Sequence, residues 1–323
     1  MKPEILFFNV YHFVRSMIAE AAGAQDLSVR IRFPMKKAHV RTDSHDPLKN
    51  RQLTELTVII PGNPGVDLFY DKFASELASG MKHHHRVLTI SHSNHIRIDD
   101  SWEFSSLQSQ ITDKIELLSS NLSKNIKINL IGHSIGAYMA LKMAPLLAKQ
   151  GFTVNDIFCL FPTFERMASS PNGRLFMKLR SFGVHHLVIY ILAPLVHYLV
   201  PNFVKTWLVM FHFRSFSVPQ SIIDGVLEAC HPNNVRNYLY MSFDELDTVA
   251  ELDELLLLQA VECSKKVTLY YGENDAWCPR YYGKELALRN LPVSIVFCEN
   301  DCEHAFVIND SEVMAQWLLD YIA

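Results

Sequence analysis

Residues 126–140 read IKINLIGHSIGAYMA, and this stretch decides the fold. Its first half, Ile126 to Ile131, is a short apolar run of the kind that forms a buried strand. Its second half, from Ala137 onward, has the composition of a helix. The five residues between them, Gly-His-Ser-Ile-Gly at 132–136, match the G-x-S-x-G turn that joins a strand to a helix in enzymes with a serine nucleophile.

Crowding explains the spacing of this turn. Ser134 must sit on a sharp, strained turn for its hydroxyl to stand above the sheet, at a cost of about 1–3 kcal/mol. A Cβ atom two residues before or after it would collide with the turn, which favours Gly132 and Gly136. The helix then begins behind Ser134, so the N–H of Ile135 faces any oxyanion formed there. The alternative is an ordinary glycine- and serine-rich loop of an α/β domain.

The composition excludes several classes of protein. The 323 residues can form one large α/β domain with an insertion or two small domains. The chain is 49% hydrophobic and carries a net charge of −4, which argues against a disordered chain and against nucleic-acid binding. Its six cysteines show no C-x-x-C pairing, so we expect reduced thiols and no metal site.

Apolar strand patterns alternate with helical patterns along much of the chain, which predicts a mostly parallel sheet with right-handed crossovers. A half-buried strand is expected near the N-terminus, at 27–33. The other expected strands are 56–60, 86–90, 126–131, 154–161, 266–271 and 293–297. The expected helices are 69–81, 104–122, 137–149, 281–290 and 313–322.

Residues 163–260 interrupt the alternation and contain no good strand pattern. We interpret 1–162 and 261–323 as the core and 163–260 as a helical cap. Within the cap lies a hydrophobic segment, 181–216, in which 181–204 holds no Asp, Glu, Lys or Arg. Pro194 and Pro201 are expected to interrupt the helical pattern. Two apolar halves with a break near Pro194 suit a hairpin that dips into one leaflet of a lipid surface. The alternative is an apolar lid over a pocket.

The strand at 56–60 stops at Pro-Gly-Asn-Pro-Gly, residues 61–65. In enzymes with this kind of elbow, the loop after this strand supplies the second N–H of the oxyanion hole. Proline has no N–H to donate, so Asn63 is our candidate, with Ile135 as the other donor. The alternative is a plain double turn that closes the strand. The triplet His83–His85 is expected to be a solvated loop.

Serine catalysis with a histidine base needs a carboxylate that orients the imidazole, and the expected chain order is Ser, acid, His. Asp275 follows one late strand and His304 follows the next, which fits that order. Glu273 and Asp301 compete with Asp275 for the role of the acid. Asp275 is preferred because Gly272 lets its loop turn and Trp277-Cys278-Pro279 could pin that loop. His133, beside the serine, is expected to be structural.

These features together resemble the lipid droplet-associated hydrolase family. The resemblance rests on the Pro-Gly-Asn-Pro-Gly loop, the Gly-His-Ser-Ile-Gly turn, the loop Gly-Glu-Asn-Asp-Ala-Trp-Cys-Pro at 272–279 and His304, and it includes the hydrophobic insertion. It implies an α/β-hydrolase fold and a serine lipid hydrolase that needs no cofactor. It also implies location at lipid droplets and the cytosol-facing endoplasmic reticulum surface, with neutral lipid esters such as sterol esters as substrates.

Two other functions remain open at the level of sequence. One is a protein that organises lipid droplets and has little or no hydrolase activity. The other is a soluble esterase or thioesterase that uses 181–216 only as a lid.

Overall fold

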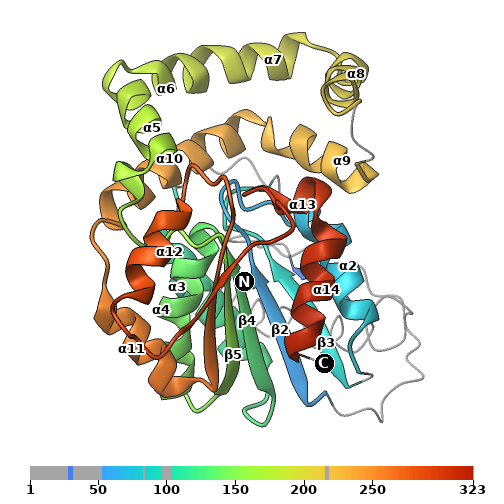
Figure 1. The fold of residues 1–323 in the computed structure, drawn as a ribbon. Helices are drawn as coiled ribbons and strands as arrows, with labels where there is room; N and C mark the ends of the chain where they lie inside the picture. Colours follow the sequence, from blue (N-terminus) through green and yellow to red (C-terminus); the bar gives the residue numbers. More distant parts are fainter. Residues whose placement is uncertain (1–27, 32–52, 83, 97–103, 215–217, 323) are drawn as a thin grey trace, which may run out of the picture.

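A computed structural model of the chain describes residues 28–31, 53–82, 84–96, 104–214 and 218–322. Within these residues, seven strands form one sheet in the order β1-β3-β2-β4-β5-β6-β7, and every pair of neighbours is parallel (Figure 1). The strands are β1 (Ser28–Ile31), β2 (Glu55–Ile60), β3 (His85–Ile90), β4 (Lys127–His133), β5 (Thr153–Leu160), β6 (Lys266–Tyr271) and β7 (Ser294–Phe297). The predicted parallel sheet is therefore confirmed.

Helices cover both faces of this sheet (Figure 1). One face carries α2 (Asp71–Ser79) and α14 (Ser311–Ile322), which contact each other. The other carries α3 (Leu107–Asn121), α4 (Ile135–Lys149), α11 (Glu254–Cys263) and α12 (Arg280–Ala287). The sheet separates two apolar cores, which explains why its central strands are buried and read as continuous apolar runs.

The register of the central strands positions the elbow. β4 lies between β2 and β5, and Gly132 pairs with Ile60 on one side and Cys159 on the other. Because parallel strands end at the same edge of a sheet, the loop at 61–65 lies directly against the turn at Ser134.

The described residues between 163 and 260 form only helices. After the short η2 (Met167–Ser169), the helices are α5 (Pro171–Ser181), α6 (Val184–Leu187), η3 (Val188–Leu192), α7 (Ala193–Leu199), α8 (Asn202–His212), α9 (Gln220–Ala229), α10 (Pro232–Thr248) and α11. Figure 1 shows α6, α7 and α8 above α9 and α10, on the side of the molecule where the strands end.

The expected break at Pro194 is wrong. The chain remains helical from α6 through η3 into α7, and the N–H of Ala193 bonds to the carbonyl of Val188 in a π-helical turn. Proline lacks the N–H of a normal helical turn, and a π turn beside it accommodates the loss. The expected interruption at Pro201 is confirmed, because α7 ends at Leu199 and Val200, which precedes Pro201, is extended.

The histidine triplet and the first strand differ in part from what was expected. His85 is not in a solvated loop: it is the first residue of β3, it is buried, and its Nε2 lies 2.7 Å from the Thr57 hydroxyl. His84 is exposed as expected, while His83 lies outside the described residues. The strand expected at 27–33 is described only at 28–31.

No single helix among the described residues has the length and apolar character needed to cross a membrane. One bent pair, Pro171–Ser181 and Val184–Leu199 with 74° between them, meets that test by length and composition.

Candidate active site

Ser134 occupies a strained turn between β4 and α4. Its φ and ψ are 54° and −123°, a backbone conformation that residues with a side chain rarely adopt. A Cβ added at Gly132 would lie 2.3 Å from the carbonyl oxygen of Gly136, and one added at Gly136 would lie 2.1 Å from that of Ile60. The two glycines therefore permit the strained turn, as the spacing predicted.

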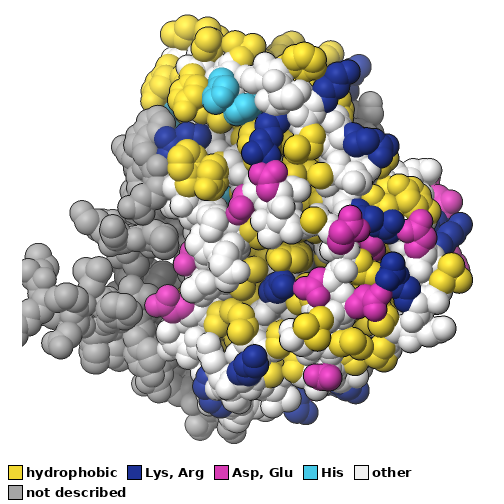
Figure 2. All heavy atoms as spheres, turned by 90° about the vertical axis from the view of Figure 1, so that its left-hand side faces the viewer, with side chains coloured by type: hydrophobic (Ala, Val, Ile, Leu, Met, Phe, Trp, Pro, Cys, Tyr) yellow, Lys and Arg dark blue, Asp and Glu magenta, His cyan; other side chains and the backbone are white. Residues whose placement is uncertain are grey.

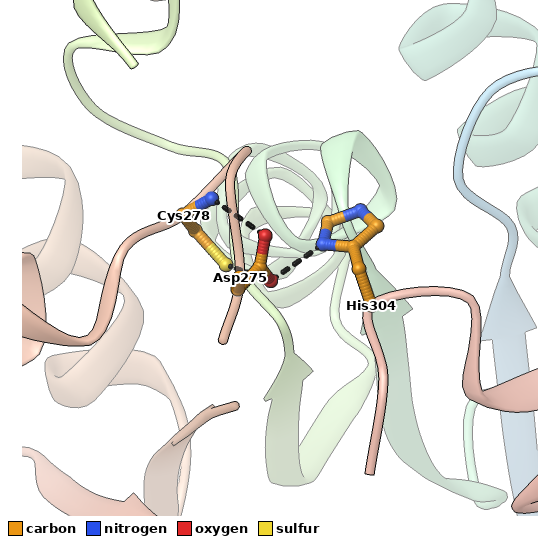
Figure 3. A group of neighbouring side chains, drawn as sticks. All are labelled: Asp275, Cys278 and His304. Carbon is orange, nitrogen blue, oxygen red and sulfur yellow. Dashed lines mark hydrogen bonds and ion pairs between the residues drawn. The ribbon is translucent and has the colours of Figure 1, made fainter. Parts of the chain in front are cut away.

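Asp275 lies in the loop after β6 and is held by several donors (Figure 3). The backbone N–H groups of Trp277 and Cys278 donate to its Oδ1, at 2.7 and 3.1 Å. The Cys278 thiol donates to its Oδ2 at 2.9 Å. Only 1% of the Asp275 side chain is exposed, so these donors replace the water that a carboxylate would otherwise bind.

His304 lies between the two other side chains. Its Nδ1 is 2.6 Å from Oδ2 of Asp275, and its Nε2 is 3.0 Å from Oγ of Ser134. With the proton on Nδ1 donated to Asp275, Nε2 is free to accept the serine proton. Burial acts to raise the pKa of Asp275, but His304 and Cys278 favour its charged form more strongly, and the pKa ends below its usual value.

The two candidate oxyanion donors lie beside this group. Ile135 is the first residue of α4, directly after Ser134. Asn63 follows Gly62, where an added Cβ would lie 2.9 Å from the Cβ of Ser134. The Gly62 N–H is already donated to the Tyr70 hydroxyl at 2.8 Å, which makes Asn63 the next N–H in the loop.

The side chain of Asn63 is held by the cap. Its Nδ2 donates to the carbonyl of Tyr238 at 2.9 Å, to the Ser242 hydroxyl at 2.9 Å and to Oε1 of Glu245 at 3.1 Å. All three acceptors lie on α10. Burial raises the pKa of Glu245 well above its usual value, and the hydrogen bond from Asn63 acts in the opposite direction.

The competing acids lie elsewhere. Glu273 is exposed and pairs with Arg280. Asp301 is exposed and accepts a hydrogen bond from Asn274. Neither contacts His304 among the interactions of the described residues.

A pocket of about 440 Å³ opens at Ser134 between the core and the cap. Its walls are mostly apolar and aromatic, and the cap contributes Met167, Phe176, Phe213, Ile222, Val226 and Leu246. A pocket of this kind suits a ligand with an apolar body.

Comparison with known proteins gives the family. A family model described as "Lipid-droplet associated hydrolase" matches residues 53–307. The chain belongs to the lipid droplet-associated hydrolase family. A relative of that name from Gallus gallus is 33% identical over 282 residues, which cover 83% of this chain and 84% of the relative. The human relative is 30% identical over 280 residues, covering 82% of this chain and 83% of its own.

Solved structures give the fold of this family member. A structure from a study of carboxylesterases of Nitrososphaera gargenis has a TM-score of 0.58 at 19% identity, covering 84% of this chain and 91% of its own. The enol-lactonase of Burkholderia xenovorans has a TM-score of 0.54 at 15% identity, covering 85% and 93%. This protein thus has the α/β-hydrolase fold that its sequence predicted.

Sequence reasoning missed three polar contacts of the hydrolase site. Trp277-Cys278-Pro279 were expected to pin the loop of Asp275, but the Cys278 thiol was not identified as a donor to the Asp275 carboxylate. Tyr70 and Glu245 gave no local signal, because they reach the site from η1 (Asp67–Tyr70) and from α10.

The donor atoms of Asp275, Cys278 and His304 lie within 4.8 Å of one another, close enough to serve as metal ligands. In this structure the thiol and the imidazole both contact the same carboxylate oxygen, at 2.9 and 2.6 Å. These are hydrogen-bonding distances, so the chemistry of the group is already explained without an ion. The expected absence of a metal site stays a prediction.

Proposed function

We propose that this protein is a serine hydrolase that cleaves carboxylic esters of lipids. The observation that carries the proposal is the continuous set of contacts from Ser134 Oγ through His304 to Asp275, at 3.0 and 2.6 Å. Nucleophile, base and orienting acid within hydrogen-bond reach of one another are the arrangement that acyl transfer through serine requires.

In the proposed reaction, Ser134 Oγ attacks the ester carbonyl while its proton passes to His304 Nε2. The N–H groups of Asn63 and Ile135 stabilise the oxyanion. The C–O bond of the ester then breaks, and His304 returns the proton to the departing alcohol. A water molecule, deprotonated by His304, attacks the acyl-enzyme and releases the carboxylic acid. Asp275 keeps His304 in the required tautomer throughout.

We propose neutral lipid esters as the substrate class, with cholesteryl esters as one candidate. The largely apolar pocket supports an acyl chain or sterol body rather than a charged substrate. The names of the relatives, lipid droplet-associated hydrolases, point the same way.

We further propose that the hydrophobic segment 181–216 binds a lipid surface. Its helices expose many large apolar side chains, and Figure 2 shows hydrophobic side chains over the top of the molecule. The most exposed are Phe182, Tyr190, Tyr198, Leu199, Phe203 and Trp207, each at least 60% accessible. An apolar patch of this kind marks an interaction site. In the sequence, Arg180 precedes the segment, Arg214 lies near its end, and Lys205 lies within it on α8.

The surface that we propose is that of a lipid droplet or of the endoplasmic reticulum membrane on its cytosolic side. The six cysteines are all free thiols in the structure, which suits a reducing compartment. A protein that only organises droplets would use the same apolar surface.

The test is hydrolysis of emulsified esters by the wild type and by Ser134→Ala. Cholesteryl, triacylglycerol and monoacylglycerol esters of the same fatty acid separate the alcohol part from the acyl chain. We expect release of fatty acid by the wild type and loss of that release in the variant. Equal release by both proteins, or none by a folded wild type bound to the emulsion, would contradict the proposal.

A further inference from the structure

A chain of hydrogen bonds runs behind the site. The Gly62 N–H donates to the Tyr70 hydroxyl at 2.8 Å, and that hydroxyl lies 2.5 Å from Nδ1 of His133. On the other side of the ring, Nε2 of His133 lies 2.8 Å from the backbone carbonyl oxygen of His304. The chain thus connects the loop after β2, the elbow and the loop that carries His304.

Each proton in this chain has one consistent position. The carbonyl of His304 can only accept, so Nε2 of His133 must carry a hydrogen. In a neutral ring Nδ1 then accepts, and the Tyr70 hydroxyl is its donor. Burial lowers the pKa of His133 to about 3, which keeps the ring neutral near pH 7.

Packing holds the side chains of Tyr70 and His133 in place. Tyr70 and His133 are buried, with exposed fractions of 3% and 6%. The imidazole of His133 meets Phe306 edge to face at 5.0 Å between ring centroids, and Phe161 at 6.1 Å. A side chain with this packing has little freedom to change rotamer.

We infer that Tyr70 and His133 are positioning residues, which fix the loop of Gly62 and Asn63 and the backbone of His304 relative to Ser134. Among the described residues neither side chain makes a hydrogen bond to the side chain of Ser134 or His304, although the rings of His133 and His304 lie 5.3 Å apart between centroids. The oxyanion donors and the base must each lie within a fraction of an ångström of their productive places. The hydrogen bonds of Tyr70 and His133 connect the loop of the oxyanion donors with the loop of the base. The predicted effect on catalysis rests on the proposed function. The hydrogen bonds of Tyr70 and His133 can be tested independently of it.

The first test replaces the hydroxyl of Tyr70. We expect Tyr70→Phe to lower the rate of fluorophosphonate labelling and kcat for a water-soluble ester about 10- to 100-fold, because a displacement of about 1 Å has effects of this size. KM should change no more than about twofold, since the hydroxyl is engaged with protein groups. The matched control is Tyr271→Phe, which removes a buried hydroxyl that has no hydrogen-bond partner among the described residues. The kcat of this control should equal that of the wild type.

The second test detects the hydrogen bonds of His133 directly and needs no measurement of activity. ¹⁵N NMR of the histidine rings, with His133 assigned by its loss in His133→Gln, should show the neutral Nε2–H tautomer at pH 7. In Tyr70→Phe the Nδ1 resonance should shift, because this nitrogen loses its donor, while Nε2–H remains. An Nδ1–H tautomer or a charged ring in the wild type would contradict the proposed hydrogen bonds from Tyr70 through His133 to the carbonyl of His304.

The outcomes separate the two proposals. A wild type that does not label but shows the expected tautomer would contradict the proposed function and leave the chain of hydrogen bonds standing. A wild type that labels, with a folded Tyr70→Phe variant that labels equally fast, would contradict the positioning role alone.

Discussion

At the scale of single residues, the environment of Asp275 orients the imidazole of His304. Its Oδ2 accepts from both His304 and Cys278, and its Oδ1 accepts two backbone N–H groups. A carboxylate with this many donors stays ionised and fixed in direction.

Replacing Asp275 by Asn should therefore cost far more than one hydrogen bond. An amide can present its NH₂ group to Nδ1 of His304, which would leave the proton on Nε2 and prevent that nitrogen from accepting from Ser134. We expect kcat for a soluble ester to fall by about 10⁴-fold while the protein remains folded. A fall of less than tenfold would show that another group orients His304; Glu273→Gln, in an exposed side chain, is the matched control.

Cys278 offers a finer test of the same environment. Removing the thiol in Cys278→Ala should raise the pKa of Asp275 toward its usual value and lower kcat about 3- to 10-fold, because one donor to Oδ2 is lost. Cys278→Ser keeps a donor and should recover most of this activity. Cys159→Ala, in a buried cysteine of β5, is the control for simple loss of volume. Equal activity of the Ala and Ser variants at Cys278 would contradict a role for the thiol as donor.

At the scale of elements, α3 carries a lysine, Lys114, whose side chain is buried. Lys114 is fully buried, and its Nζ donates to Oε1 of Gln110 at 3.2 Å. Burial lowers the pKa of Lys114 to about 7. In the unfolded chain the pKa is about 10.4, so between pH 7 and 10 the unfolded chain holds a proton that the folded protein does not.

The sign of the pH dependence follows directly. A base whose pKa is lowered on folding destabilises the folded state at low pH, and this cost shrinks as the pH rises from 7 toward 10. We expect Lys114→Met to raise the midpoint of thermal unfolding at pH 6.5, by about 2–4 °C for each kcal/mol regained. Compared with Lys114→Met, the wild type should gain stability between pH 7 and 9. A lower midpoint for the variant at pH 6.5 would contradict this.

Element by element, the sequence predicted the strands better than the cap. β2 and β4 are short apolar runs between turn residues, and such runs are readable because buried parallel strands have no polar face. The helical character of the cap was also readable. The continuity of the helix through Pro194 was not, because a π turn compensates for the missing N–H and leaves no pattern in the sequence.

Some contacts of the candidate site could also be predicted from the sequence, and others could not. Ser134, Asp275 and His304 were placed together because each follows a strand, and parallel strands end at one edge. The contact of Tyr70 with His133, and that of Asn63 with α10, join residues far apart in the sequence with no motif between them. These contacts arise from packing, which a single sequence does not display.

At the scale of the whole molecule, α6, α7 and α8 lie on the side where the strands end (Figure 1). These helices carry exposed apolar side chains, among them Tyr198, Phe203 and Trp207. The pocket at Ser134 is lined by residues of the same cap, including Phe213, one residue beyond the end of α8. A lipid held at this surface would thus lie near the pocket, and binding and hydrolysis would share one side of the protein.

Charge introduced into this surface should separate binding from chemistry. Phe203 and Trp207 are 75% and 60% exposed on α8, so the double change to Glu should be tolerated by the fold. We expect the fraction that floats with triacylglycerol droplets to fall at least about tenfold, because each buried aromatic side chain contributes about 1.5–3 kcal/mol. Hydrolysis of a water-soluble ester should remain.

The matched control for the cap surface is Leu288→Glu. The side chain of Leu288 is 81% exposed and directly follows α12, outside the cap. Its flotation should equal that of the wild type. Unchanged flotation of the double variant would show that droplets bind elsewhere on the protein.

The most direct test of the central claim is fluorophosphonate labelling of the purified protein in the presence of lipid, followed by mass spectrometry of its peptides. This reagent reacts with a serine whose hydroxyl is activated by a base and whose oxyanion is stabilised. We predict a single phosphonylated residue, Ser134, with labelling lost in Ser134→Ala and greatly slowed in Asp275→Asn. A folded wild type that is not labelled, or a label on another serine, would contradict the assignment of Ser134 as the nucleophile.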